Sequence, residues 1–104
     1  MLLLWLDDER TPPSSDWIWV KTAWDAIKAL QTSYFNVVSL DHDLGKDAGE
    51  GYDVLLYIEE KVHLDPNYRA PEIRLHTANT SARIRMALAA ESIERKIRES
   101  KSNS

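Results

Sequence analysis

The chain has 104 residues, of which 13 are Lys or Arg and 17 are Asp or Glu, and it contains no cysteine. The slightly acidic balance excludes a general electrostatic attraction to nucleic acid or to anionic membranes, so any nucleic-acid substrate must be held by local contacts. The absence of cysteine excludes disulfide partners and thiolate metal sites, and nothing calls for an oxidising compartment, so we expect a cytoplasmic protein.

A chain of this length forms one domain around a single core. We expect that domain over residues 1–100 and a frayed tail over residues 101–104. The first apolar run, Leu2–Leu6, has no basic residue before it and meets acidic residues after five apolar positions. Because this run is too short for a signal peptide or a membrane span, we expect a buried strand and no membrane association.

Four segments are predicted to be strands. Leu2–Leu6 and Val37–Leu40 are almost continuously apolar, as parallel strands covered on both faces are. Trp17–Val20 is β-branched and aromatic, and its two tryptophans on one face indicate an edge strand. Glu72–Leu75 follows a proline and alternates polar with apolar residues, which also predicts an edge.

Three segments have the period of a helix. The first begins after a possible N-cap at Thr22 and is apolar at Ala23, Ala26, Ile27 and Leu30. The others are predicted over about residues 51–63 and 81–99. Helices between the later strands require crossovers, which predicts a mostly parallel sheet with helices on both faces. Residues 11–15 are too short and too rich in proline for a helix, so a loop or a single turn must join the first two strands.

Three of the predicted strands end in polar clusters: Asp7–Glu9, Asp41–Asp43 and His76–Asn79. In an open parallel sheet, ligands bind outside the carboxyl ends of the strands, so these clusters are expected to meet at one edge. The sequence therefore predicts a metal and phosphate site there.

Four carboxylates would lie within a few ångströms of one another if the first and third strands are neighbours: Asp7, Asp8, Asp41 and Asp43. Like charges that close raise one another's pKa unless a cation neutralises them, and hard oxygen ligands suit Mg²⁺, Mn²⁺ or Ca²⁺. The alternative is that these residues only cap turns and helices.

Three segments resemble the receiver domains of response regulators: Leu6–Glu9 after the first strand, Leu40–Asp41 after the third and Thr77–Ala78 after the fourth. The resemblance implies a truncated receiver-like (flavodoxin-like) α/β fold. Its sheet would be four-stranded and mainly parallel in the order 2-1-3-4, with three main helices.

The resemblance also implies roles for the matching residues. Asp8 and Asp41 would bind the metal with the acidic neighbour Asp7, which orients the site, and Thr77 would contact a phosphoryl oxygen. We therefore expect Mg²⁺ or Mn²⁺ as the cofactor. In receivers the residue that matches Asp41 also accepts a phosphoryl group.

The chain also departs from the receiver pattern. The chain ends with one helix after Thr77, so the fifth strand and its lysine have no counterpart, and the short first connection removes the first receiver helix. The segments Leu4–Arg10, Ser39–Gly45 and His76–Asn79 resemble more closely the cyclic-phosphate processing receiver domains. That resemblance covers nearly the whole chain and implies action on cyclic phosphate ends in RNA repair.

The catalytic candidates are Asp41, Asp43 and His76. A metal can polarise a phosphoryl oxygen and activate a water, and a histidine with a pKa of about 6.5 can give a proton to a leaving alkoxide. His76 is the better candidate for that acid or base, although a surface or hydrogen-bonded structural role is its alternative. His42 is expected to point away from its acidic neighbours and to support the site from behind.

Substrate contacts are expected from Arg10, Thr77 and Asn79. Arg10 could grip a phosphate with its guanidinium or pair with neighbouring acids, and Asn79 could bind a phosphoryl oxygen or cap the last helix. The glycine-containing loop over residues 45–51 is either a mobile flap beside the site or only a connection.

The leading interpretation is a metal-dependent phosphoesterase whose partner is a phosphate-containing substrate, an RNA end or a nucleotide. One alternative is a truncated receiver that accepts a phosphoryl group on Asp41 and signals. The other is a non-catalytic binding or inhibitory module that uses the strand of Trp17 and Trp19 as its surface.

Overall fold

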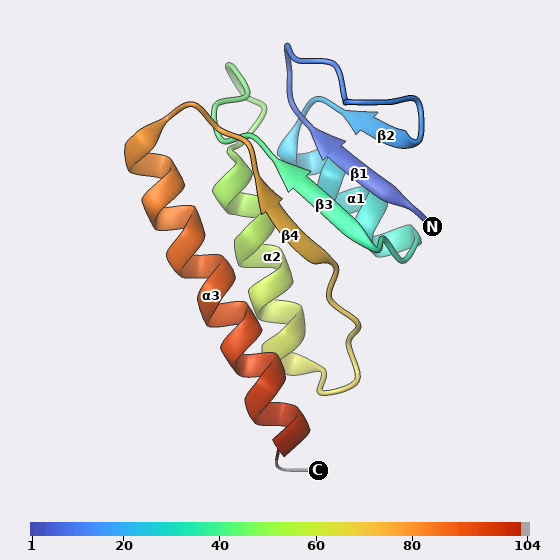
Figure 1. The fold of residues 1–104 in the computed structure, drawn as a ribbon, viewed down its shortest axis with the longest axis vertical. Coiled ribbons are helices and arrows are strands. Elements are labelled where there is room, and N and C mark those ends of the chain that lie inside the picture. The colour runs from blue at the N-terminus through green and yellow to red at the C-terminus, as the bar shows by residue number, and fades with distance from the viewer. Residues whose placement is uncertain (103–104) are drawn as a thin grey trace.

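A computed structural model describes residues 1–102 of the chain. Its elements, in chain order, are β1 (Leu3–Leu6), β2 (Trp17–Val20), α1 (Ala23–Thr32), β3 (Val37–Leu40), α2 (Gly51–Leu64), β4 (Glu72–Leu75) and α3 (Thr80–Ser102). The four strands form one parallel sheet in the order β2-β1-β3-β4, with β2 and β4 at its edges (Figure 1). The predicted strands, their order and the truncated receiver-like α/β fold are confirmed.

The helices begin where local capping favours them. The side chain of Thr22 accepts a hydrogen bond from the backbone N–H of Asp25 at 3.0 Å, as an N-cap residue does. At the start of α2, the side chains of Glu50 and Asp53 form a reciprocal capping box. Helix α3 continues to Ser102, three residues past its predicted end, so residues 101 and 102 of the expected frayed tail are helical, and residues 103–104 lie outside the described residues.

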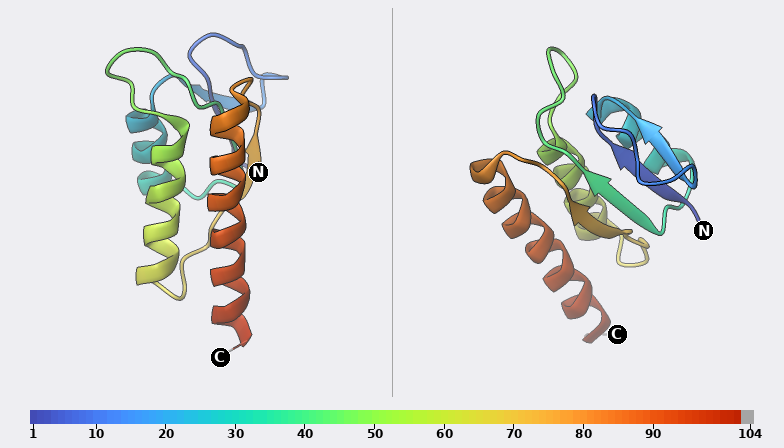
Figure 2. Two further views of the ribbon diagram at one scale, coloured as in Figure 1. Left: turned by 90° about the vertical axis from the view of Figure 1, so that its left-hand side faces the viewer. Right: turned by 45° about the horizontal axis from the view of Figure 1, so that its top comes forward.

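All three helices lie on one face of the sheet, which Figure 2 shows in its left view. The prediction of helices on both faces is therefore wrong. Right-handed crossovers from β2 to β3 and from β3 to β4 run in the same direction across the sheet, so both place their helices on the same face. Only the β1–β2 crossover runs the other way, and its residues form a loop with no helix, as the sequence predicts.

The hydrophobic core lies between this helical layer and the sheet. Leu4, Leu6, Val38 and Leu40 project from the sheet into it and meet side chains from the helices, among them Ala26, Leu55, Ile58, Met86 and Ile93. Because side chains alternate along a strand, Trp5 and Ser39 lie on the opposite face, side by side on paired strands.

Gly51 makes the join between β3 and α2 possible. Its backbone N–H donates to the carbonyl of His42 at 3.1 Å, and a Cβ at this position would collide with the carbonyl oxygen of Asp41. Only glycine permits so close an approach, which draws the N-terminus of α2 against the polar end of β3.

Among the described residues, no helix combines the length and the apolar character that crossing a membrane requires.

Candidate metal and phosphate site

The polar ends of β1, β3 and β4 meet around one open pocket at the carboxyl edge of the sheet. The pocket has a volume of about 350 Å³ and is lined by Asp7, Asp8, Glu9, Arg10, Asp41, Asp43, Gly45, Thr77, Ala78 and Asn79. The three clusters that the sequence places at strand ends are thus brought together.

Three carboxylates form the acidic centre of this pocket. Asp7, Asp8 and Asp41 each offer an oxygen, and these atoms all lie within 4.8 Å of one another. Asp7 and Asp41 are buried, with 1% and 9% of their surface exposed, whereas Asp8 is half-buried. A compact set of hard oxygen donors with this much negative charge fits a cation such as Mg²⁺ or Mn²⁺.

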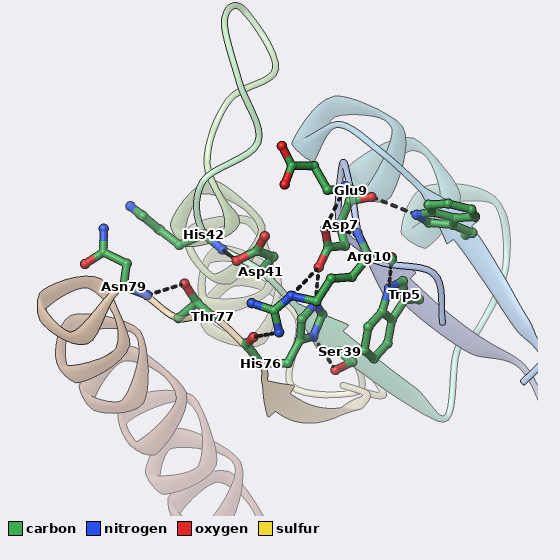
Figure 3. A network of polar contacts seen from close by, with 11 residues as sticks. Trp5, Asp7, Glu9, Arg10, Ser39, Asp41, His42, His76, Thr77 and Asn79 are labelled. Carbon is green, nitrogen blue, oxygen red and sulfur yellow. Dashed lines mark hydrogen bonds and ion pairs between the residues drawn. The ribbon is translucent and has the colours of Figure 1, made fainter. Parts of the chain in front are cut away.

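Asp7 is held by hydrogen bonds to both of its oxygens. Oδ1 accepts the backbone N–H groups of Glu9 and Arg10, each at 2.8 Å, and Oδ2 lies 3.1 Å from Nε2 of His76 (Figure 3). Burial favours the neutral acid, but the two backbone donors and the His76 ring outweigh it, so the pKa of Asp7 lies below its usual value. Asp7 is therefore ionised at neutral pH.

Two tryptophans fix the turn that carries these acids. The indole N–H of Trp19 donates to the carbonyl of Asp7 at 2.7 Å, and that of Trp5 donates to the carbonyl of Arg10 at 2.9 Å. Both rings lie on the face of the sheet that has no helix, so the turn is anchored to that face.

Asp41 follows β3 and keeps its backbone in the sheet, donating its N–H to the carbonyl of Leu6 at 2.9 Å. Its Oδ1 accepts the backbone N–H of His42 at 2.8 Å. The next acid, Asp43, is exposed at the rim of the pocket, where its Oδ2 accepts the amide of Asn79 at 3.3 Å.

His76 lies beneath the acidic cluster and is not among the residues that line the pocket. Its Nδ1 is 2.7 Å from the hydroxyl of Ser39, its Nε2 contacts Asp7, and its ring stacks on Trp5 with centroids 3.9 Å apart and an interplanar angle of 3°. Burial lowers the pKa of His76, and the neighbouring Asp7 offsets this only in part. The ring of His76 is hydrogen-bonded on both nitrogens, and its role as a general acid or base stays a prediction.

His42 points away from the carboxylates beside it, as the alternation of side chains predicts. It is buried, its Nε2 lies 2.5 Å from a carboxylate oxygen of Glu50, and its Nδ1 has no hydrogen-bond partner among the described residues. His42 thus supports the start of α2, which lies behind the pocket.

Arg10 is the one cationic residue among those lining the pocket. Its Nη1 donates to the carbonyl of His76 at 3.2 Å, its Nε lies 3.9 Å from Oδ2 of Asp7, and 54% of its side chain is exposed. The weak pairing with Asp7 leaves most of the guanidinium accessible to an anion at the mouth of the pocket.

Thr77 and Asn79 form the wall on the side of α3. The hydroxyl oxygen of Thr77 accepts the backbone N–H of Asn79 at 3.1 Å, so its own O–H remains available to donate. The side-chain oxygen of Asn79 accepts the N–H of Ala82 at 3.0 Å, which makes Asn79 the cap of α3. Its amide also contacts Asp43, so Asn79 joins two walls of the pocket.

The loop between β3 and α2 stands over the pocket, where Gly45 lines it. Its far side is attached to α1: the N–H of Ala23 donates to the carbonyl of Ala48 at 2.8 Å, and the indole of Trp24 donates to the carbonyl of Asp47 at 3.2 Å. Of the two interpretations of this loop, mobile flap or connection, the structure tests neither, but it identifies the contacts that hold the loop.

Four residues that shape the site escaped the sequence analysis: Trp5, Trp19, Ser39 and Gly51. Their common signal is position, since the first three share the face of the sheet from which Asp7, Asp41 and His76 project. Counting by twos back from Asp7 and Asp41 gives Trp5 and Ser39, and the pairing of β1 with β2 adds Trp19.

The chain matches the family model of the cyclic-phosphate processing receiver domain over residues 2–92. It therefore belongs to that family, a class of receiver-like α/β domains whose name links them to the processing of cyclic phosphates. A search of curated proteins found no match to the chain.

Proposed function

We propose that the protein is a metal-dependent phosphoesterase that hydrolyses a cyclic phosphate at an RNA end or in a nucleotide. The observation that carries this proposal is the approach of three carboxylate oxygens to within 4.8 Å of one another in a pocket that also presents a guanidinium. A centre for a divalent cation beside a group that binds phosphate is the arrangement that phosphoester hydrolysis uses.

Asp8 and Asp41 would hold Mg²⁺ or Mn²⁺ directly, with Asp7 as the third acid of the cluster. When bound, the ion supplies a Lewis acid for a phosphoryl oxygen and lowers the pKa of a water. The donor set supports this assignment because oxygen ligands from carboxylates suit these ions.

Arg10 and the hydroxyl of Thr77 would bind the phosphoryl oxygens, and Asn79 would complete that wall. Asp43, which is exposed at the rim, would take a proton from the attacking water and give a proton to the leaving ribose oxygen. The water oxygen bonds to phosphorus, one ester P–O bond breaks, and the product is a phosphate monoester. Proton donation by His76 stays a prediction.

The test is a screen of cyclic mononucleotides, RNA with a 2′,3′-cyclic phosphate end and linear monoesters, each with Mg²⁺, Mn²⁺ or a chelator. We expect hydrolysis that depends on the metal and is lost in Asp41→Ala, while Glu94→Gln, on an exposed part of α3, retains it. Full activity in the Asp41→Ala variant would contradict the proposal.

The phosphoacceptor alternative keeps one supporting observation, namely that Asp41 lies in the acidic cluster at the end of β3. Acetyl phosphate with Mg²⁺ distinguishes the two functions, because an acceptor is labelled stably on Asp41 whereas a hydrolase is not. A protein that does neither would be a binding module, with the exposed Trp19 of β2 as its first candidate contact.

A further inference from the structure

We propose that His76 is a positioning residue that fixes the carboxylate of Asp7 through Nε2–H, and that Ser39 and Trp5 hold its ring for this task. The inference rests on the proposed metal site, because its consequence is the geometry with which the acidic cluster receives a cation. It assigns to His76 a role other than transfer of a proton to the substrate.

The direction of the hydrogen bond follows from the chemistry of its acceptor. An ionised carboxylate only accepts hydrogen bonds, so Nε2 of His76, 3.1 Å from Oδ2 of Asp7, must carry the hydrogen. In the neutral ring Nδ1 is then an acceptor, and the hydroxyl of Ser39 at 2.7 Å donates to it. The carboxylate of Asp7 thus selects the tautomer in which Nε2 is the donor, and the hydroxyl of Ser39 supplies the partner of Nδ1.

The position of the ring follows from the register of the sheet. Trp5, Ser39 and Arg74 are partners across β1, β3 and β4, and His76 follows Arg74 by two residues, so it projects from the same face. Because Ser39 is small, the imidazole can reach across β3 and lie flat on Trp5, 3.9 Å away. A larger side chain at position 39 would occupy that path.

The ring has little freedom left. One of its faces covers Trp5, both nitrogens have partners, and only 14% of the side chain is exposed. The side chain of Arg10 crosses above it to reach the carbonyl of His76 (Figure 3). A residue in this position reaches the pocket through Asp7, which agrees with the absence of His76 from the residues that line it.

Asp7 is consequently fixed at both oxygens, by two backbone donors on Oδ1 and by His76 on Oδ2. Groups that orient the ligands of a metal commonly change metal affinity or activity by about 10- to 100-fold when they are removed. Loss of the Nε2 donor should therefore weaken cation binding even where no substrate is present.

Two substitutions of His76 remove the imidazole ring, but only one of them keeps a hydrogen-bond donor near Asp7. In His76→Gln the side-chain amide can occupy the place of Nε2 and still donate to Asp7, whereas the shorter amide of His76→Asn reaches only toward Ser39. We expect Mn²⁺ binding, measured by calorimetry or electron paramagnetic resonance on the full chain, to fall about 10-fold or more in His76→Asn and to stay within roughly threefold in His76→Gln. Equal Mn²⁺ affinity in the Asn variant and the native protein would overturn the inference.

A spectroscopic readout does not depend on any variant folding. Nitrogen-15 spectra of the metal-free protein should show the hydrogen of His76 on Nε2, where the carboxylate of Asp7 requires a donor. A ring protonated on Nδ1 alone would contradict the inference.

The outcomes also separate this inference from the proposed function. If the native protein hydrolyses no cyclic phosphate but Mn²⁺ affinity follows the Gln and Asn pattern, the reaction is wrong and the positioning role stands. If both variants lose turnover equally while binding Mn²⁺ as the native protein does, His76 acts as the general acid and the positioning role fails.

Discussion

The acidic residues of the pocket are not equivalent at the scale of single residues. A carboxylate offers about four lone-pair sites, and Asp7 already accepts two backbone N–H groups and the His76 ring. Asp8, by contrast, is only half-buried and lies at the open side of the cluster. Asp7 therefore organises the cluster, while Asp8 and Asp41 keep more capacity for a cation.

Arg10 provides a residue-scale prediction about phosphate. Arg10→Lys keeps the charge but loses the planar fork, so we expect the KM for a cyclic phosphate to rise about 10-fold. Mn²⁺ affinity should stay within roughly threefold, because the Nε of Arg10 lies 3.9 Å from Asp7 and contributes little to holding it.

The matched control for Arg10 is Arg69→Lys, since Arg69 lines a separate cavity with Tyr34 and Tyr68. Steady-state kinetics and competition by inorganic phosphate measure both variants. An unchanged KM in Arg10→Lys would remove Arg10 from the phosphate site.

Gly51 provides a second prediction at this scale. Gly51→Ala drives a Cβ into the carbonyl of Asp41, a contact between backbone groups that no side-chain rotation relieves. We expect a loss of more than about 3 kcal/mol in the free energy of unfolding, measured with urea, together with weaker Mn²⁺ binding.

Gly45→Ala is the comparison for Gly51→Ala. Gly45 has a φ of 88°, but the nearest atom to an added Cβ is an oxygen of Asp8 at 3.7 Å. Because the added methyl group strains the backbone but meets no atom closely, the free energy of unfolding of Gly45→Ala should fall by only about 1 kcal/mol. Equal losses in the two variants would show that close packing against β3 is not what position 51 requires.

At the scale of elements, three connections build the pocket on the ends of a rigid sheet. The turn after β1 is anchored by the indoles of Trp5 and Trp19, and the segment after β4 is capped into α3 by Asn79. The loop after β3 is attached to α1 by only a few hydrogen bonds. We therefore expect the pocket to change shape most easily at this loop.

The contact between Trp24 and the loop after β3 can be tested alone. Trp24→Phe keeps most of the ring but loses the N–H that donates to the carbonyl of Asp47. Without this hydrogen bond, the free energy of opening the loop should fall by about 1 kcal/mol. The amide of Ala23, which donates to the carbonyl of Ala48, should then exchange its hydrogen roughly fivefold faster.

The amide of Asp41 is the internal control for Trp24→Phe, because it donates to Leu6 within the sheet and should exchange at its native rate. Equal acceleration at Ala23 and Asp41 would mean that the variant loosens the whole domain and not the loop.

At the scale of the whole molecule, the domain has two layers, with helices on one face of the sheet and none on the other (Figure 2). The strands and the meeting of three clusters could be predicted from the apolar runs and from the parallel sheet that helical crossovers require, and the resemblance to receiver domains implied the strand order. The one-sided cover needs a further step: the two right-handed crossovers that carry helices run in the same direction across the sheet, and the short β1–β2 connection carries no helix.

The orientation of His76 could not be read from its own neighbours in the sequence. It depends on the small size of Ser39 and on the ring of Trp5. These two residues lie 37 and 71 positions before His76 in the sequence, and only the strand register brings them beside it. A strand-end histidine beside acids looks like a proton donor in sequence, whereas the contacts with Asp7, Ser39 and Trp5 are visible only in the folded domain.

The crowding of negative charge at one edge gives the last prediction, which concerns the stability of the whole domain. Five carboxylates and one guanidinium line the pocket, so like charges should oppose folding, and a bound cation would relieve that repulsion. Mn²⁺ at 100 times its Kd should add about 2.7 kcal/mol to the free energy of unfolding. For a domain of this size, that raises Tm by on the order of 10 °C in a thermal melt.

Asp41→Asn tests whether the stabilisation by Mn²⁺ comes from the pocket. Removing one of the buried charges should raise the Tm of the metal-free protein, because repulsion is relieved, and should abolish most of the rise caused by Mn²⁺. Glu94→Gln changes the net charge equally on the exposed side of α3 and should leave both values as they are in the native protein. A rise of equal size in all three proteins would mean that Mn²⁺ screens surface charge in general, and the acidic edge of the sheet would then have no specific cation site.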